Sequence, residues 1–381
     1  MKCDWPEYTV AELIQLGFLD PPMDGNHGAI HPKTSDYVSS GVPFIMANDL
    51  VNGTIDFSSC AFITEKQAST LRKGFSHPGD VLLTHKATIG RTAIVPSTYE
   101  TVILTPQVTY YRTKKGLSNR YLKYYFDSDY FQNTLSNWAG SGSTRSYLGI
   151  TAQQKLPILF PPIDVQEKIA GLCGTLDNRI SNNNKINDNL AQQAQAIYAD
   201  MFISNADPAW PLGHLSDLIT VKYGKDHKKL DDGQYPVYGS GGIMRYVERP
   251  LYDKESVLIP RKGTLNNVLY VNEPFWSVDT MFFTEMKLPN VAKYVYHYVK
   301  SKDLASLNAG SAVPSMTTDI LNAMELLIPD ADSLSRFESI VAPMFLAMQQ
   351  NTQESSKLAK IRDTLLPRLM SGELDVSDLD L

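Results

Sequence analysis

The stretch that decides the fold covers residues 164–203, DVQEKIAGLCGTLDNRISNNNKINDNLAQQAQAIYADMFI. Apolar and small side chains recur in it at alternating spacings of three and four, which predicts a long helix with a single packing seam. The centre of this seam is polar, whereas its ends are apolar. The seam runs through Leu176, Ile180, Asn183, Asn187, Leu190, Ala194 and Ile197.

The same pattern returns near the end of the chain, with the polar centre and the apolar ends in the same places. The second seam runs through Met344, Met348, Asn351, Ser355, Leu358, Arg362 and Leu365. Every member of the second seam follows its counterpart in the first seam by the same number of residues. Asn351, for example, is the counterpart of Asn183, and we call this constant separation the repeat offset. A constant offset over this length indicates a tandem repeat. Each helix cannot bury its seam alone, so we expect the two to pack as a coiled coil whose polar centre fixes the register.

The repeat predicts four segments of a mixed α/β chain. Two similar globular parts, residues 1–163 and 207–331, are each followed by a long helix, at 164–206 and 332–381. A chain of 381 residues is long enough for two such cores.

The helix ends and interruptions can also be predicted. Asp164 followed by Glu167 fits a capping box at the start of the first helix. Gly171 and Gly174 weaken its early turns, and Pro343 removes a backbone donor from the second helix. We therefore expect a kink or a break near the start of each helix.

The composition favours a globular protein without a membrane span. Hydrophobic residues make up 43% and charged residues 20%, and no apolar run approaches the roughly 18 residues that cross a bilayer. The first residues lack the apolar core of a signal peptide. The three scattered cysteines suggest neither disulfides nor a thiolate metal site, so a reducing cytoplasm is the expected location.

The net charge of −6 neither favours nor excludes DNA as a partner. Most of it lies in the helical segments, with −2 for residues 164–206 and −3 for 332–381. The globular parts are near neutral, at +1 for residues 1–163 and −2 for 207–331, so they can still carry local basic patches.

Each globular part contains a strand, a basic turn and a second strand. In the first part we expect strands at 81–83 and 93–95 around a turn at 84–91, and in the second part strands at 257–259 and 268–271 around a turn at 260–267. Lys and Arg in such turns suit phosphates, and Asn, Thr and Arg suit base edges. The candidate DNA-binding residues are Lys86, Thr88, Arg91, Arg261, Lys262, Thr264, Asn266 and Asn267.

Further basic side chains lie nearby in the sequence, although each could equally be an ordinary solvated charge. A small-residue loop also precedes each long helix, at 140–146 and 308–315. These segments add the candidates Arg112, Lys114, Ser143, Arg145, Lys222 and Lys225.

No catalytic signature stands out. The aromatic residue expected after Asp20-Pro21-Pro22 in an amino methyltransferase is missing, and no phosphate-binding loop occurs. His27 and His31 have the spacing of metal ligands on a helix, but they lie in a loop rich in Gly and Pro.

At this point the sequence resembles the specificity (S) subunits of Type I restriction-modification enzymes. The likeness rests on the opening Trp5-Pro6, the pattern from Asp80 to Gly90, the loop before the helix, and the strand at 156–161 that leads into the first helix. It extends to the closing segment LLPRLMSGE at 365–373, so it covers essentially the whole chain and both repeats.

The resemblance implies two target recognition domains, each reading half of a split double-stranded DNA site, with the two helices packed antiparallel as a spacer. It also implies a chain without catalytic activity that recruits two methylation subunits and, in the full complex, restriction subunits. S-adenosylmethionine, ATP and Mg would bind to those partners, so no cofactor or metal is expected on this chain. The first turn has His85-Lys86-Ala87 where the second has Arg261-Lys262-Gly263, which is nearer the family pattern.

Two alternatives follow from the residues alone. One is a coiled-coil scaffold whose near-neutral globular parts bind protein or carbohydrate. The other is a free-standing nuclease or methyltransferase, which would show metal- or cofactor-dependent activity.

Overall fold

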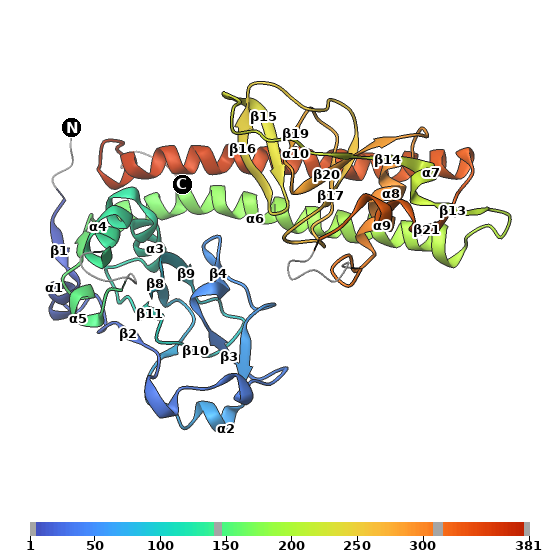
Figure 1. Ribbon diagram of the computed structural model, residues 1–381. Coiled ribbons are helices and arrows are strands. Elements are labelled where there is room, and N and C mark those ends of the chain that lie inside the picture. The colour runs from blue at the N-terminus through green and yellow to red at the C-terminus, as the bar shows by residue number, and fades with distance from the viewer. Residues whose placement is uncertain (1–4, 141–146, 308–314, 377–381) are drawn as a thin grey trace. The chain divides into compact units, whose positions relative to one another are not determined.

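The structure is a computed structural model that describes residues 5–140, 147–307 and 315–376 (Figure 1). It forms two compact units. The first contains residues 1–182 and 354–381, and the second contains residues 183–353. Each unit therefore combines one globular part with half of each long helix. Among the described residues, no helix has the length and apolar character that a membrane span requires.

The first unit is built on two four-stranded sheets, with strand orders β2-β11-β8-β9 and β6-β3-β10-β7, and two small two-stranded sheets, β1-β12 and β4-β5. Its strands are β1 (Glu7–Thr9), β2 (Met23–Asp24), β3 (Val42–Ile45), β4 (Leu50–Val51), β5 (Thr54–Ile55), β6 (Ala61–Ile63), β7 (Phe75–Ser76), β8 (Val81–Lys86), β9 (Thr88–Ile94), β10 (Val102–Leu104), β11 (Val108–Tyr111) and β12 (Pro157–Leu159). Its short helices are α1 (Val10–Gln15), α2 (Glu65–Ala68), α3 (Asn119–Asp127), α4 (Asp129–Gly140) and α5 (Ile150–Gln153).

The second unit has a four-stranded sheet of order β14-β20-β17-β18, a three-stranded sheet of order β16-β15-β19 and the pair β13-β21. Its strands are β13 (Leu212–His214), β14 (Ile219–Tyr223), β15 (Asp232–Gly239), β16 (Gly242–Val247), β17 (Ser256–Pro260), β18 (Leu269–Val271), β19 (Trp276–Ser277), β20 (Met281–Met286) and β21 (Glu325–Leu327). Its short helices are α7 (Leu215–Leu218), α8 (Ala292–Lys300) and α9 (Thr318–Asn322).

The repeat extends to single hydrogen bonds in the cores of the two units. The Tyr121 hydroxyl donates to the Leu159 carbonyl at 2.9 Å, and Tyr294 donates to Leu327 at 2.6 Å. The two acceptors are separated by the repeat offset. In both units, a tyrosine of a short helix, α3 or α8, therefore fixes the last strand before the long helix.

The long helices α6 (Ile163–Ala199) and α10 (Ala331–Met370) are drawn in green and red in Figure 1. A turn of π-helix, Asp200–Ser204, extends the first. Both helices are continuous past Gly171, Gly174 and Pro343, so neither helix is broken there. The glycine at position 174 leaves room for Arg120, because a Cβ there would lie 2.0 Å from Nη2 of Arg120.

The predicted capping box is also wrong. Since α6 already begins at Ile163, Asp164 lies inside its first turn rather than at its N-cap. In α10 the capping carboxylate is Asp330, whose Oδ1 accepts the backbone N–H of Ser333 at 2.7 Å. The other oxygen of Asp330 accepts the indole N–H of Trp210 at 2.9 Å.

Within each unit, α6 and α10 run antiparallel. In the first unit, Asp177 pairs with Arg362 and the later Arg179 pairs with the earlier Glu354. In the second unit, Asn183 and Asn187 hydrogen-bond successively earlier residues of α10, Asn351 and Met348.

The seam residues differ in burial. Asn183, the predicted polar centre, is 1% exposed and Ala194 is fully buried. The same spacing also predicts Ile340, one turn before Met344, as a member of the seam, but this residue is 41% exposed. The other apolar residues of the predicted seam are half-buried, namely Leu176, Ile180, Leu190, Ile197, Met344, Met348, Leu358 and Leu365.

Candidate nucleic-acid interface

The basic turn of the first unit is a tight β-hairpin rather than the longer turn that the sequence predicts. Strands β8 and β9 pair up to Lys86 and Thr88, which lie directly opposite each other. Only Ala87 separates them, in the left-handed region with φ of 65°. The register shift between Leu83 and His85 allows the strands to extend this far. Lys86 is therefore presented at the very tip of a rigid ribbon.

This hairpin tip is joined to the segment that follows the small-residue loop. Lys86 forms an antiparallel β-bridge with Tyr147, and its Nζ lies 5.9 Å from the centre of the Tyr147 ring. The backbone N–H of Leu148 donates to the carbonyl of His85 at 3.0 Å. Lys86 is exposed and Tyr147 is 50% exposed, so a cation and an aromatic ring lie together on the surface.

The second unit repeats this connection. Lys262 forms an antiparallel β-bridge with Ser315, and the backbone N–H of Met316 donates to the carbonyl of Arg261 at 2.9 Å. Ser315 follows Tyr147 at the repeat offset, as the second long helix follows the first. We call these two pairings, Lys86 with Tyr147 and Lys262 with Ser315, the turn bridges.

The side chain of His85 hydrogen-bonds the segment that forms the first turn bridge. Its side chain is fully buried, and its Nδ1 lies 3.0 Å from the carbonyl oxygen of Leu148. Because a carbonyl only accepts hydrogen bonds, Nδ1 carries the proton. Burial lowers the pKa of His85, and no described residue pairs with its Nε2. The equivalent residue of the second unit is Arg261, whose guanidinium lies 5.4 Å from the centre of the Tyr223 ring.

A second element lies against each basic turn. In the first unit, Nη1 of Arg91 donates to the carbonyls of Ala47 and Leu50 at 3.4 and 3.3 Å, which attaches β9 to the start of the β4–β5 hairpin. In the second unit, Nδ2 of Asn267 donates to the carbonyl of Ser240 at 2.9 Å, which attaches the turn to the tip of the β15–β16 hairpin.

Other predicted DNA-binding residues are held in ion pairs within their own unit. Nε and Nη2 of Arg112 each bind an oxygen of the buried Asp80 carboxylate at 2.8 Å. Lys114 pairs with Asp20 at 2.5 Å. A two-pronged pair with a buried acid has a structural role, so Arg112 is the weakest DNA-binding candidate of the first unit.

The remaining candidates of the second unit are placed differently. Lys222 lies 3.4 Å from Glu285, and Asn266 uses its side-chain amide to bind Asp303 at 2.9 Å. Thr264 and Lys225 are exposed, whereas Thr88 of the first unit is half-buried. Ser143 and Arg145 lie outside the described residues, as does most of the second small-residue loop.

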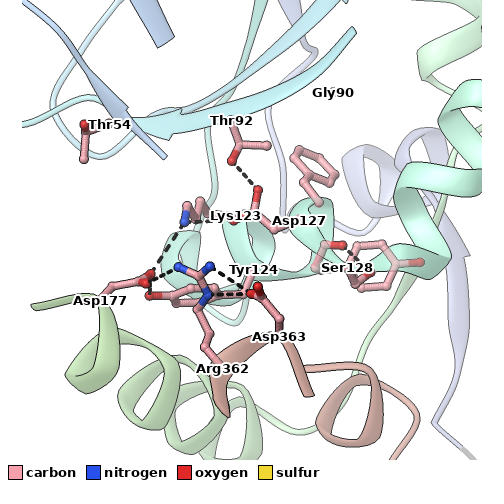
Figure 2. Close-up of polar contacts among 12 residues, drawn as sticks. Thr54, Gly90, Thr92, Lys123, Tyr124, Asp127, Ser128, Asp177, Arg362 and Asp363 are labelled. Carbon is pink, nitrogen blue, oxygen red and sulfur yellow. Dashed lines mark hydrogen bonds and ion pairs between the residues drawn. The ribbon is translucent and has the colours of Figure 1, made fainter. Parts of the chain in front are cut away.

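A polar network connects the first hairpin to both long helices (Figure 2). Thr92 of β9 donates to Asp127 of α3, and Nζ of Lys123 lies 2.8 Å from the other oxygen of Asp127. The same Nζ lies 3.8 Å from Asp177 of α6, which binds Arg362 of α10 at 2.6 Å. The hairpin that carries Lys86 is thus fixed to the helix pair through charged side chains.

The described residues hold no cluster of three His, Cys, Asp or Glu side chains that could bind a metal ion. His27 lies 2.9 Å from Asp24, and the ring of His31 hydrogen-bonds the carbonyl of Asn26. Both histidines therefore belong to the loop that the sequence predicts around them.

Two residues that complete the turn bridges, Tyr147 and Ser315, are absent from the candidates that the sequence predicts. A signal was present, since Ser315 follows Tyr147 at the repeat offset. Because the two residues differ in chemistry, a search for matching side chains does not find them. Only the alignment of the two long helices identifies Tyr147 and Ser315 as equivalent.

Comparison with known proteins agrees with this architecture. The family model of the Type I restriction modification DNA specificity domain matches residues 4–192 and again residues 209–340. The Type I restriction enzyme MjaIX specificity subunit of Methanocaldococcus jannaschii is 24% identical, over 91% of this chain and 90% of that protein. A putative type I specificity subunit of Mycoplasma genitalium is 25% identical over 60% of this chain and 65% of its own.

The fold is also that of a solved structure. The crystal structure of the Type I restriction-modification system S subunit from M. genitalium superposes with a TM-score of 0.60 at 17% identity, covering 96% of each chain. The family matches do not favour a carbohydrate- or protein-binding scaffold, or a free-standing nuclease or methyltransferase. With two specificity domains that fill most of its length, the chain belongs to the non-catalytic DNA specificity subunits of Type I restriction-modification systems.

Proposed function

We propose that each unit binds one half of a split double-stranded DNA target through its turn bridge. The observation that carries this proposal is the duplication of the bridge. In both units an exposed lysine, Lys86 or Lys262, lies at a basic turn that is fixed to the segment before the long helix. A lysine held on a rigid turn suits a phosphate contact that sets the position of the neighbouring side chains on the bases.

The two halves of the target should differ in sequence. Beside Lys86 lie the aromatic ring of Tyr147 and the buried His85, whereas beside Lys262 lie Ser315 and Arg261. An arginine or a serine can hydrogen-bond base edges, while a tyrosine offers mainly an aromatic face. Similar scaffolds with different side chains at the bridge support recognition of an asymmetric, bipartite site.

The proposal extends to partners. Two methylation subunits would bind the helix pair and transfer methyl groups to adenine, and restriction subunits would join the full complex. S-adenosylmethionine, ATP and Mg would be held by those partners rather than by this chain. Since chromosomal DNA is the substrate of such a complex, the cytoplasm is its expected place of action.

Fluorescence anisotropy with DNA duplexes tests the turn bridges. Lys86→Gln and Lys262→Gln, in the full-length chain with its methylation subunits, should each weaken binding and lower the slope of log affinity against log salt by about one. Lys66→Gln, an exposed lysine of α2, is the matched control and should change neither quantity. Unchanged affinity and slope in both turn variants would rule out the proposed contacts.

The target itself can be found in the host. Sequencing methylated adenines with and without this gene should reveal two half-sites separated by a fixed spacer. A single uninterrupted site would contradict the bipartite model.

A further inference from the structure

The β15–β16 hairpin of the second unit has features that the turn bridge does not explain. β16 is the edge strand of the sheet β16-β15-β19, and the two strands pair up to Gly239 and Gly242. A Cβ atom built on Gly241 or Gly242 would meet no other atom within 4 Å. The hairpin is drawn in yellow in Figure 1, and its tip is unobstructed at these two glycines.

Large apolar side chains cover the outside of this hairpin. Ile243, Met244 and Tyr246 are 50%, 59% and 49% exposed. Exposed apolar side chains on the edge strand of a sheet favour association unless a partner covers them. The sequence from Gly239 to Tyr246 has a single charged residue, Arg245, whose guanidinium pairs with Asp232 at 2.9 Å, so the tip itself carries no unpaired charge.

The tip is continuous with the second turn bridge. Asn267 Nδ2 donates to the carbonyl of Ser240 at 2.9 Å. On the other side of the turn, a Cβ at Gly263 would lie 2.7 Å from Oγ of Ser240, so this glycine lets the tip approach the residue next to Lys262. A ligand that binds Lys262 therefore lies beside the hairpin tip.

We propose that the β15–β16 hairpin enters the major groove of the DNA next to the phosphate bound by Lys262, where Ile243 and Met244 contact the 5-methyl groups of thymine. This inference rests on the proposed function of the second turn bridge. A two-stranded β-ribbon fits the major groove, and thymine is the base that presents an apolar group there. The exposed side chains of Ile243 and Met244 on such a ribbon match this apolar group.

The first unit provides a contrast. In that unit, the element that lies against the basic turn is the β4–β5 hairpin, whose tip is Asn52-Gly53. Val51, 40% exposed, is flanked there by the exposed polar side chains of Asn52 and Thr54. The first half-site should therefore depend less on thymine methyl groups than the second.

The test begins with a duplex library carrying randomised positions, from which the full-length chain and its methylation subunits select a preferred site. Duplexes of the selected site are then prepared with deoxyuridine in place of thymidine, in the second half-site alone or in the first alone. Deoxyuridine keeps the base pair and removes only the methyl group. Binding is measured for the wild-type chain, the double variant Ile243→Ala/Met244→Ala and the control Leu288→Ala, an exposed leucine of the same unit.

We expect deoxyuridine in the second half-site to weaken wild-type binding by about fourfold for each contacted methyl group, the equivalent of about 0.8 kcal/mol. The double variant should bind the thymidine duplex correspondingly less well and should be insensitive to deoxyuridine. Leu288→Ala should behave as the wild type.

The hairpin contact is overturned if the wild-type chain binds the thymidine and deoxyuridine duplexes equally, or if the double variant keeps both its affinity and its sensitivity to the methyl group. Lys262→Gln distinguishes these failures from failure of the proposed function. If only the hairpin contact is wrong, this variant still weakens binding and lowers the salt slope. If the second turn bridge does not bind DNA, Lys262→Gln has no effect.

Discussion

Nδ2 of Asn351 donates a hydrogen bond to Oδ1 of Asn187 at 2.9 Å, across the seam of the two long helices in the second unit. Asn187 in turn donates to the carbonyl of Met348 at 3.2 Å, and the nearby Asn183 is 1% exposed. Polar side chains in a helix seam cost stability, but they permit only the register in which their hydrogen bonds are satisfied. These amides therefore fix the register of α6 against α10 within the second unit.

The first prediction concerns these amides. Asn351→Leu should lower the free energy of unfolding by about 1–3 kcal/mol, because Asn187 loses its donor at a half-buried site. The double variant Asn187→Leu/Asn351→Leu should recover most of this loss, since two apolar residues fill the seam without an unsatisfied group. Urea unfolding followed by circular dichroism measures both values.

Asn184→Leu, at an exposed position of α6, serves as the control for these substitutions. If the double variant were as unstable as the sum of its two single variants, the amide pair would not be the unit that stabilises the seam.

The second prediction concerns the charged pair of the first unit. Asp177 accepts hydrogen bonds from Arg362 at 2.6 Å and from Tyr124 at 2.7 Å, with about a quarter of each charged side chain exposed. At the repeat offset, the equivalent positions of the second unit are Phe345 and Ala194, which are 9% and 0% exposed. One unit thus joins its helices by an ion pair where the other uses an apolar contact.

We expect Arg362→Ala to destabilise the first unit by about 1–3 kcal/mol, because Asp177 loses its nearer cation in a partly buried site and keeps only Lys123 at 3.8 Å. Asp177→Phe combined with Arg362→Ala copies the second unit and should be less damaging than Arg362→Ala alone. A double-mutant cycle from denaturant unfolding measures the coupling. Additive effects of the two substitutions would show that the ion pair contributes no stability of its own.

The sequence is sufficient to predict the parts of the fold that depend on periodicity. The seam spacing predicts two long helices with a polar centre, and α6 and α10 are joined at that centre by the hydrogen bond between Asn187 and Asn351. The strands around the second basic turn are also confirmed. These features depend on the order of apolar and polar residues, which is local information.

The sequence does not predict features that depend on contacts between distant segments. The short first hairpin depends on the strained backbone of Ala87 and on a register shift. The ion pair between Arg112 and Asp80 depends on how β7, β8 and β11 pack together, which a list of basic residues does not reveal. The candidate DNA-binding residues stay predictions, which binding experiments with DNA test.

The third prediction concerns the duplicated tyrosines. Tyr121 lies on α3 and Tyr294 on α8, and their hydroxyl partners are visible only in the structure. Tyr121→Phe and Tyr294→Phe should each cost about 1 kcal/mol, because each leaves a strand carbonyl without its donor. Tyr246→Phe, at a half-exposed position, should cost much less. Thermal unfolding measures the three values, and equal losses in all of them would refute a role for the core hydrogen bonds.

The fourth prediction concerns pH and the second unit. His297 is 2% exposed, its Nδ1 lies 2.9 Å from Oε1 of Gln195 on α6, and its ring stacks on Tyr198. Burial, with a smaller contribution from Lys300, lowers the pKa of His297 to about 4. In the unfolded chain the ring takes up a proton at about pH 6.5, so below that pH the unfolded state binds more protons than the folded state.

The contribution of His297 is therefore complete above pH 6.5 and is lost as the pH falls from 6.5 to about 4. The total loss should be about 3 kcal/mol, since each pKa unit corresponds to about 1.4 kcal/mol. The free energy of unfolding, measured between pH 7 and pH 4 for the wild-type chain and for His297→Asn, isolates this contribution as the difference between the two curves. Parallel curves for wild type and His297→Asn would mean that the buried ring is not the group that titrates, because a neutral side chain at this position cannot gain a proton in either state.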